Sequence, residues 1–218
     1  MAPRKRSDDG SRPGLTRNGI ATTALRMIDD GGSSAFSMRR LGAELGVDPS
    51  ALYWHFRGRE ELFEAVAEIL VDEIGAASLP WTAPWPELLT AYGVRLYEVL
   101  IRHPHAVIVF ASRPVRSEFG VRAANHAVEL MVADGFTAAQ AVRAIQALRA
   151  YVVGCALDVS ATAVTGLQPR RQSARPPADN LLAQGVLDAG EHFRPGLDAM
   201  IRGLSAVVAR GTRGQPPA

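Results

Sequence analysis

Residues 37–63 read SMRRLGAELGVDPSALYWHFRGREELF, and this stretch decides how the rest of the chain is interpreted. It has the layout of a helix-turn-helix, in which a short helix and a glycine turn lead to a second helix whose outward face can enter a DNA major groove. The two helices cross closely, which requires small side chains at the crossing and a residue tolerant of positive φ in the turn. Gly42 and Gly46 meet these requirements, so we predict a DNA-binding motif.

Capping residues place this motif within a small helical head. Thr16, Ser37 and Asp48 are suitable N-cap residues, and Pro49 suits the first position of a helix. Gly46 takes the position after the last turn of the second helix. The pattern predicts helices over about 16–30, 37–45, 49–56 and 60–74.

The second helix of the motif has an unusual outer face. The residues spaced to pack inward are Leu41, Leu45, Val47, Leu52 and Phe56. A solvated helix face normally carries Lys, Glu or Gln, whereas the remaining face is short, uncharged and aromatic. Tyr53 and Trp54 can donate hydrogen bonds to phosphates, and Ser50 and Ala51 are small enough for the backbone to approach base edges and thymine methyls. The alternative is that both aromatic side chains belong to the core.

Basic residues flank this face. Arg39 and Arg40 lie in the first turn of the preceding helix, and we expect one of them to contact DNA and the other to be a surface residue. Arg59 lies at the start of the following helix, whose free amides also favour phosphate, and its alternative is a plain surface role. His55 either hydrogen-bonds within the head or contacts DNA directly. The predicted DNA-binding residues are Arg39, Arg40, Pro49, Ser50, Ala51, Tyr53, Trp54, His55 and Arg59.

The rest of the chain has long helical patterns and no credible strand alternation. Pro80, Pro84 and Pro86 mark a linker, and helices are predicted over about 86–102, 105–111, 117–133, 137–164 and 194–210. Residues 165–180 have loop composition, and a weak helix is predicted over 180–188. The expected fold is all-α, with a three-helix head joined by a fourth helix to a larger helical body.

Three segments are predicted along the chain. Residues 1–15 are polar and contain glycine and proline, so we expect a disordered basic arm. Its Arg4, Lys5 and Arg6 either follow a phosphate backbone or minor groove, or form a solvated tail. The helix-turn-helix domain is predicted over 16–62, and an effector-binding and dimerisation domain over 63–218.

Composition limits the class of protein. A chain of 218 residues, 47% of them hydrophobic, can bury a core without disulfides or structural metals. The single cysteine, together with the lack of a secretory signal or an apolar run long enough to span a bilayer, predicts a cytoplasmic protein without a membrane anchor. The absence of a phosphate-binding glycine loop and of a nucleophile elbow argues against an enzyme, and no cofactor is predicted.

Charge adds a weaker signal. The net charge of +2 lies in residues 1–62, which carry 10 basic and 8 acidic side chains, against 14 and 14 in the remainder. Lys5 is the only lysine among 24 basic residues, a bias that a GC-rich coding sequence also explains. Guanidinium groups, which suit phosphate and guanine, are then nearly the only cations available to a DNA site.

The segment LGAELGVDPSALYWHFRGREEL resembles the DNA-binding segment of TetR-type transcriptional repressors. The similarity lies in the leucine-glycine-valine turn, the tyrosine, the histidine-phenylalanine pair and the basic residue before an acidic helix start. It is close over residues 16–75, whereas the body resembles the family in layout, notably at 100–104 and 193–204. Two departures stand out. Gly42 replaces a usual alanine, which should loosen the helix by up to about 1 kcal/mol, and Pro49 and Ser50 replace glutamine and proline, so the operator sequence should differ.

The resemblance implies a homodimer that binds a palindromic double-stranded DNA operator. A small-molecule effector would change the spacing or tilt of the two heads, so that they no longer fit successive major grooves. The helices at 137–164 and 194–210 are candidates for the dimer interface because they are rich in Ala, Val, Leu and Gly, although a buried helix within one chain has the same composition. The alternative is a DNA-binding regulator without an effector, controlled by a partner protein or constitutive.

An effector cavity should be mostly apolar with a few polar groups. The candidates in the body are His103, His105, Phe110, Arg113, Asn125, His126, Arg149, Tyr151, Cys155 and Asp158, each with an ordinary core or surface role as its alternative. Tyr151, Cys155 and Asp158 share a helix face at spacings of four and three. The histidines alone are too few for convergent metal ligation, so no metal site is predicted.

Overall fold

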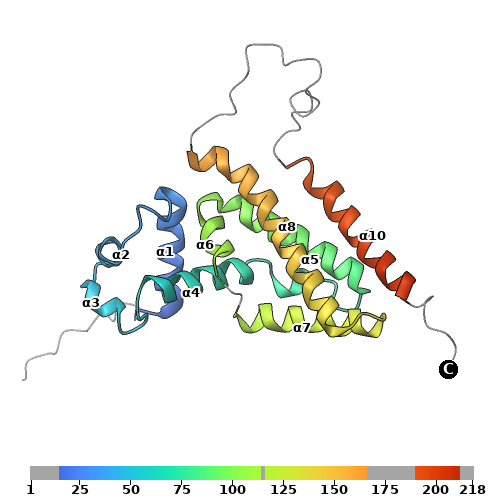
Figure 1. Ribbon diagram of the computed structural model, residues 1–218. Coiled ribbons are helices and arrows are strands. Elements are labelled where there is room, and N and C mark those ends of the chain that lie inside the picture. Colours follow the sequence, from blue (N-terminus) through green and yellow to red (C-terminus); the bar gives the residue numbers. More distant parts are fainter. Residues whose placement is uncertain (1–14, 114–115, 166–189, 212–218) are drawn as a thin grey trace, which may run out of the picture.

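The computed structural model describes residues 15–113, 116–165 and 190–211, and within these ranges every regular element is a helix (Figure 1). The all-α prediction is confirmed. The elements of the head and its extension are α1 (Arg17–Gly31), α2 (Met38–Leu45), α3 (Pro49–Leu52), α4 (Arg59–Asp72) and η1 (Ala76–Ser78). Those of the body are α5 (Trp85–Arg102), η2 (Pro104–Ala106), α6 (Val107–Ala111), α7 (Glu118–Ala133), α8 (Ala138–Thr165) and α10 (Phe193–Gly211). Residues 1–14, most of the predicted loop at 165–180 and the weak helix predicted at 180–188 lie outside the described residues.

The predicted caps of the head are confirmed. The Thr16 hydroxyl accepts a hydrogen bond from the Gly19 amide at 3.1 Å, and the Ser37 hydroxyl accepts one from the Arg40 amide at 3.2 Å. Gly46 adopts the left-handed conformation with φ 67° and ψ 30°, which ends α2 and turns the chain towards α3. These local signals fix where the helices of the motif begin and turn.

The third helix is shorter than predicted. It ends at Leu52, and the chain continues through turns until the Phe56 amide donates to the Leu52 carbonyl at 3.0 Å. Leu52 and Phe56 are both fully buried, so their packing decides the path of the backbone between them. Leu41 is also fully buried, and the remaining residues predicted to point inward, Leu45 and Val47, pack against the core from partly exposed positions.

The two departures from the family pattern are physically linked. A Cβ atom on Gly42 would lie 3.1 Å from Pro49 Cγ and 3.1 Å from the Val47 carbonyl oxygen, closer than ordinary van der Waals contact. An alanine at position 42 would therefore require a small shift at the crossing of α2 and α3, and the Pro49 ring supplies one of its close contacts, beside backbone atoms of Val47 and Pro49. Gly42 remains helical within α2 despite its low helix propensity.

Histidines at the end of α5 join the head to the body. His103 Nδ1 lies 2.7 Å from the carboxylate of Asp29 in α1, and its Nε2 lies 3.1 Å from the carboxylate of Glu73, which follows α4. Arg102 also contacts Glu73 at 3.2 Å, and His105 contacts the Asp29 carbonyl at 2.6 Å. The hydrogen bond to Asp29 raises the pKa of His103 despite its partial burial. This junction fixes η2 of the body against the end of α1.

Helix α4 connects the two parts without a break. It runs through the predicted boundary between residues 62 and 63 and contacts α1 of the head as well as α6 and α7 of the body. The division of the chain at that boundary stays a prediction.

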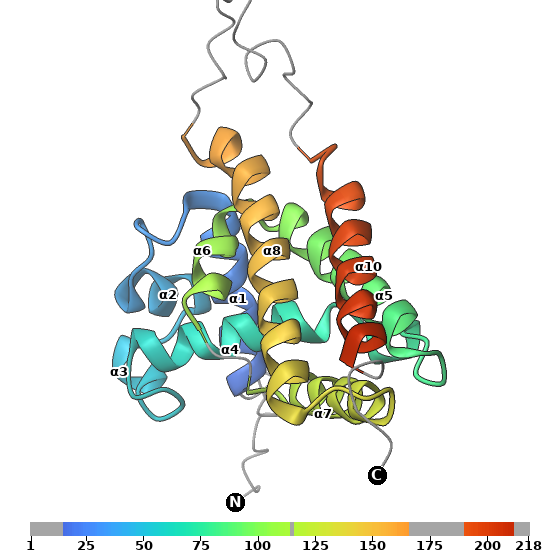
Figure 2. The same cartoon turned by 45° about the vertical axis from the view of Figure 1, so that its right-hand side comes forward.

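The body is a layered helical bundle in which α10 lies along α8 and α5 (Figure 2). Among the described residues, α8 contains one segment, Ala138–Ala161, that is long and apolar enough to cross a membrane by length and composition alone. The sequence-based expectation that the chain contains no apolar run of this length is therefore wrong. One side of α8 packs against α5, α7 and α10 within the bundle, and 39% of the apolar window is buried there.

The link between Gly42 and Pro49 predicts coupled effects on stability. Gly42→Ala should be less favourable in the natural chain than in a Pro49→Ser background, because serine removes the ring carbon that the new methyl group meets. We expect a coupling free energy of about 0.5–1 kcal/mol in a double-mutant cycle measured by urea unfolding. Additive effects of the two substitutions would contradict the steric link.

The His103 junction predicts a pH dependence of stability. Because the pKa of His103 is raised in the folded chain, its contribution is fully present below its ordinary value of 6.5 and is lost as the pH rises through the folded value. His103→Gln should therefore cost about 1–3 kcal/mol at acidic pH and less in alkaline buffer, as measured by urea unfolding. Asp29→Asn should abolish most of this pH difference. If His103→Gln lowered the free energy of unfolding equally in acidic and alkaline buffer, the predicted pH dependence would be contradicted.

Candidate DNA interface and ligand cavity

The tip of the head exposes two large aromatic side chains. Tyr53 is 55% exposed and Trp54 is 90% exposed, although they directly follow the fully buried Leu52. The alternative that both belong to the core is therefore excluded. Because Leu52 and Phe56 are held inside, the turns between them direct the intervening side chains outward. An indole this exposed at a helix end is an uncommon surface feature unless it meets a partner.

Small groups accompany the aromatic pair. Ser50 is exposed, and Pro49 and Ala51 are partly exposed beside it. Hydrogen bonds from the hydroxyl and the amide of Ser50 lower the pKa of Asp48, the N-cap of α3. The Asp48 carboxylate accepts from the Ser50 amide, and the Asp48 carbonyl accepts from the Ala51 amide, so both of these amides at the start of α3 are already bound and phosphate contacts are left to the neighbouring arginines.

The structure distinguishes the two arginines of α2. Arg40 donates to the Ala35 carbonyl at 2.7 Å, whereas Arg39 is exposed and makes no hydrogen bond or ion pair with another residue in the described ranges. Of the pair, Arg39 therefore has the whole of its guanidinium group available for a phosphate or a base. The assignment of either residue to DNA stays a prediction.

Two other arginines stabilise the head from outside its core. The Arg59 guanidinium lies 4.7 Å from the ring centre of Phe63 and donates to the Ser33 carbonyl. Arg17, which the sequence prediction missed, lies 4.2 Å from the ring centre of Phe56, 3.0 Å from the carboxylate of Glu61, and donates to the His55 carbonyl. These cation–π contacts give Arg59 a structural role, so its contact with DNA stays a prediction.

The imidazole ring of His55 makes no hydrogen bond within the part of the chain that the structure describes. The internal hydrogen bond considered for it is therefore not formed by its side chain. The ring is partly exposed next to Trp54, and its role in binding DNA stays a prediction.

In the body, a cavity lies between α5, α7 and α8. It comprises an inner hollow of about 40 Å³ and an outer hollow of about 380 Å³, which share Tyr92, Gly120, Ala124 and Ile145 in their walls. The outer volume falls in the usual range for small-molecule sites. Space exists because Gly120, Ala123, Ala124 and Ala127 present one small-residue face of α7 at helical spacing.

The polar groups of this cavity lie at its outer end. Asn125, Gln146 and Arg149 line the outer hollow. A neighbouring hollow of about 520 Å³ continues along α7 and is lined by Trp81, Asn125 and His126, among others. His126 Nε2 lies 2.8 Å from the Trp81 carbonyl, which joins α7 to the segment before α5. Sequence prediction had named Asn125, His126 and Arg149, and the structure brings them to adjoining surfaces.

Arg149 holds the end of α6. Its Nη2 donates to the carbonyls of Phe110 at 2.8 Å and Arg113 at 3.0 Å, and its guanidinium lies 4.8 Å from the centre of the Phe110 ring. Burial lowers the pKa of Arg149, and its Nε atom is buried without a hydrogen-bond partner. Phe110 itself is fully buried in the core under this group.

The other predicted cavity residues lie elsewhere. The Tyr151 hydroxyl donates to the carbonyls of His192 and Phe193, both at 3.0 Å, and burial raises its pKa to about 12. Cys155 is buried beside Tyr151 and Asp158 is exposed, and none of the three residues lines the cavity between α5, α7 and α8. His103 and His105 belong to the head–body junction. Burial also raises the pKa of the Cys155 thiol, which disfavours the thiolate that catalysis would require.

Sequence reasoning missed Trp81, Tyr92 and Ile145, which line the cavity. Their residue types do not distinguish them from core residues. The small-residue face of α7 at positions 120, 123, 124 and 127 was visible in the sequence as a repeat of glycine and alanine at spacings of three, one and three.

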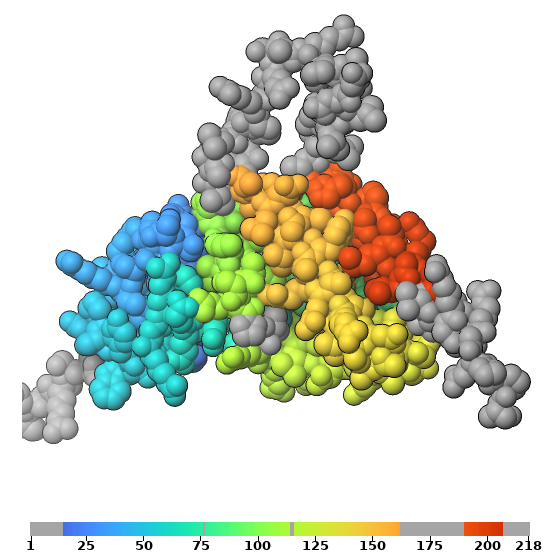
Figure 3. Space-filling view, viewed as in Figure 1, coloured from blue at the N-terminus to red at the C-terminus, as the bar shows by residue number. Residues whose placement is uncertain are grey.

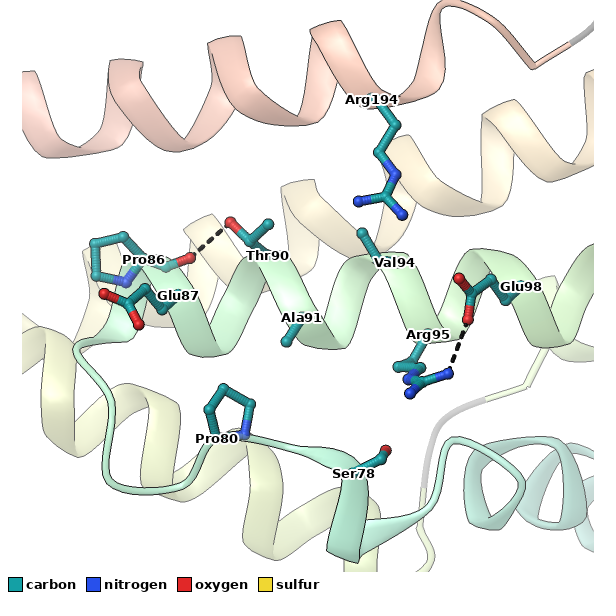
Figure 4. A pocket seen from close by; sticks show the side chains of 10 residues that line it. All are labelled: Ser78, Pro80, Pro86, Glu87, Thr90, Ala91, Val94, Arg95, Glu98 and Arg194. Carbon is teal, nitrogen blue, oxygen red and sulfur yellow. Dashed lines mark hydrogen bonds and ion pairs between the residues drawn. The ribbon is translucent and has the colours of Figure 1, made fainter.

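A second hollow of about 650 Å³ lies on the outer side of α5 (Figure 4). Arg194 of α10 reaches over it, and Arg95 and Glu98 of α5 pair with each other at 3.2 Å. With Glu87, its wall carries two acidic and two basic side chains. These charges offset each other, so the groove has no net attraction for an ion of either sign. In residues 15–113, 116–165 and 190–211, no group of three or more metal-binding side chains occurs.

Comparisons with known proteins agree with this arrangement. The family model described as bacterial regulatory proteins, tetR family, matches residues 20–66, and the model described as tetracyclin repressor-like, C-terminal domain, matches residues 79–208. Tetracycline repressor protein class G of Vibrio anguillarum is 28% identical over 205 residues, which cover 89% of this chain and 96% of that protein.

Two solved structures extend the comparison to the whole fold. A TetR variant from Acinetobacter baumannii AYE in complex with minocycline has a TM-score of 0.74 and 26% identity, covering 89% of this chain and 95% of that one. ActR of Streptomyces coelicolor in complex with (S)-DNPA has a TM-score of 0.70 and 25% identity, covering 89% and 98%. Because the carboxy-terminal model alone matches more than half of its length, the chain belongs to the TetR family of bacterial transcriptional regulators.

Proposed function

We propose that this TetR-family regulator is a repressor that binds a palindromic operator as a homodimer and is released by a small-molecule effector. The observation that carries the DNA-binding part is the exposed tip of the head, where Trp54 is 90% exposed above a fully buried Leu52. Tyr53, Trp54, Ser50 and Ala51 are the proposed groove contacts. Arg39 supplies the proposed phosphate contact, with further contacts at Arg40, Pro49, His55 and Arg59.

A dimer is supported by the outer face of α8. Its exposed residues recur at alternating spacings of three and four, which forms a seam suited to another helix: Ala147, Ala150, Gly154, Leu157 and Ala161. A Cβ atom at Gly154 would meet nothing within 4 Å in a single chain, and the same is true of Gly203 in α10. Glycine in a helix costs about 1 kcal/mol relative to alanine, and a close approach by a second copy explains why it is used.

The position of this face suits the proposed assembly. Helices α8 and α10 form one continuous surface of the body, at a distance from the helices of the head (Figure 3). Two copies joined through this surface leave both heads free. In a dimer with two-fold symmetry, the exposed tips of the two heads around α3 can then contact half-sites about one helical turn apart, or about 34–36 Å.

Contacts between α6 and α4 supply a route from the cavity to the head. Arg149 in the cavity wall holds the carbonyls of Phe110 and Arg113, and the Arg113 side chain forms an ion pair with Glu60 in the first turn of α4. A ligand that moves Arg149 therefore acts on the segment that contacts α4. This cavity argues against the alternative of a regulator without an effector. The two solved structures compared above contain minocycline and (S)-DNPA, respectively.

Removal of the aromatic tip should abolish operator binding. The test uses DNA sites selected from a random pool by the natural protein. The double variant Tyr53→Ala, Trp54→Ala should bind these sites at least about 100-fold more weakly in gel-shift titrations, because each aromatic contact contributes about 1–3 kcal/mol. Ile108→Ala, which removes a 54% exposed apolar side chain from the body, is the matched control and should bind normally. Unchanged affinity of the double variant would exclude the proposed DNA-binding face formed by Tyr53 and Trp54.

The exposed seam on α8 predicts that a large side chain at Gly154 prevents dimer formation. Gly154→Arg should convert a dimer into a folded monomer of 23.3 kDa in sedimentation equilibrium, because an arginine at this position cannot fit in a close helix contact. Helix content by circular dichroism should not change, since a single chain has open space there. Val132→Arg, at a 44% exposed position of α7, should leave the dimer intact. A monomeric natural protein, or a dimeric Gly154→Arg variant, would argue against this interface.

A further inference from the structure

The wall of the cavity carries a positive charge that has no counter-ion. Arg149 forms no ion pair with any carboxylate in the described residues, whereas Arg113 pairs with Glu60 and Arg102 pairs with Glu73. Only two neutral backbone carbonyls accept hydrogen bonds from its guanidinium group. A partly buried charge is costly unless hydrogen bonds and an opposite charge compensate it.

The geometry leaves part of this arginine available. Nη2 is occupied by the carbonyls of Phe110 and Arg113, but the buried Nε donor has no partner. Nη1, which makes no hydrogen bond to another described residue, is left to donate to an acidic oxygen, and a hydrogen bond to an ionised acceptor is about twice as strong as a neutral one. The lowered pKa of Arg149, caused by burial, is in keeping with a cation in surroundings that do not neutralise it.

The rest of the cavity wall is mostly apolar, and none of its lining residues is acidic. Neither the inner nor the outer hollow has an Asp or Glu residue in its wall. One side is the small-residue face of α7, and Tyr92 of α5 and Ile145 of α8 line both hollows. The Tyr92 hydroxyl, close enough to Arg149 for each to influence the other's pKa, makes no hydrogen bond to another described residue.

We propose that the cavity between α5, α7 and α8 binds an amphipathic organic acid. Its apolar ring system lies against the small-residue face of α7, and its carboxylate or phenolate oxygen pairs with Arg149, assisted by the Tyr92 hydroxyl. The neutral amides of Asn125 and Gln146 border the open end of the site. This assignment rests on the proposed function, because it names the chemical class of the effector for that cavity.

Arg149 also has a structural role, because it holds the end of α6. The test must separate this role from the proposed binding of an acidic ligand. The probe is a matched pair, naphthoate and naphthyl methanol, which share a ring system and differ in charge. Their binding to the full-length protein is measured by isothermal titration calorimetry near neutral pH. The variants are Arg149→Gln, which removes the charge, and Arg149→Lys, which retains it.

We expect naphthoate to bind the natural protein at least about tenfold more tightly than the alcohol, a difference of about 1.4 kcal/mol. In Arg149→Gln the two affinities should converge to within about threefold, whereas Arg149→Lys should keep part of the preference. Arg122→Gln, at an arginine of α7 that borders the neighbouring hollow, should keep the full preference. Ala124→Phe should weaken both ligands, because Ala124 lines both hollows.

Equal affinities of acid and alcohol in the natural protein would overturn the proposal, as would an undiminished preference in Arg149→Gln or the absence of acid binding. Failure of the effector role is recognised separately by gel shift with the operator. If naphthoate binds through Arg149 and leaves operator affinity unchanged, the ligand class stands and the effector role fails. If a neutral compound releases the operator equally well in Arg149→Gln, the ligand class fails and the effector role stands.

Discussion

The head depends on the burial of Leu52 and Phe56 on either side of an exposed aromatic pair. Leu52 and Phe56 are four residues apart and face the same side of the chain, where the Phe56 amide donates to the Leu52 carbonyl. The turns between them carry Tyr53 and Trp54 on the opposite, exposed side. Arg17 covers the ring of Phe56 from outside and binds the His55 carbonyl, which holds the end of this turn. The position of the exposed Tyr53 and Trp54 is therefore determined by the packing of Leu52 and Phe56 beneath them. The short crossing of α2 and α3, with no side chain on Gly42 under Pro49, brings the small residues of α3 to the same surface.

The same helices that form the head are held by the body. Asp29 of α1 binds His103, and Glu60 of α4 binds Arg113, so two charged contacts from opposite sides join the parts. The second contact leads to the cavity through Arg149, which holds the Arg113 carbonyl. Because α4 is continuous, a change at Arg149 has a mechanical path to the head that does not require unfolding of any element.

Local sequence signals predicted the fold well, and contacts distant in sequence limited the rest. The caps at Thr16, Ser37 and Asp48 act on amides two or three residues away, so they are visible in the sequence. The length of α3 was overestimated because Leu52 and Phe56 keep the four-residue spacing of a helix face although the chain between them forms turns. Arg149 was predicted as a cavity residue, but Tyr92 was not, since only the packing of α5 against α7 and α8 gives it a polar neighbour. Tyr151 and Cys155, grouped by helical spacing, face away from the cavity because α10 covers that side.

The central claim is that the exposed tips of two heads, each carrying Tyr53 and Trp54, bind together to one symmetric DNA site. Hydroxyl-radical footprinting of the full-length protein on a DNA site selected from a random pool tests this most directly. We expect a two-fold symmetric footprint with protected half-sites separated by about one helical turn, or about 34–36 Å. A footprint that covers a single half-site, or that lacks symmetry, would contradict it.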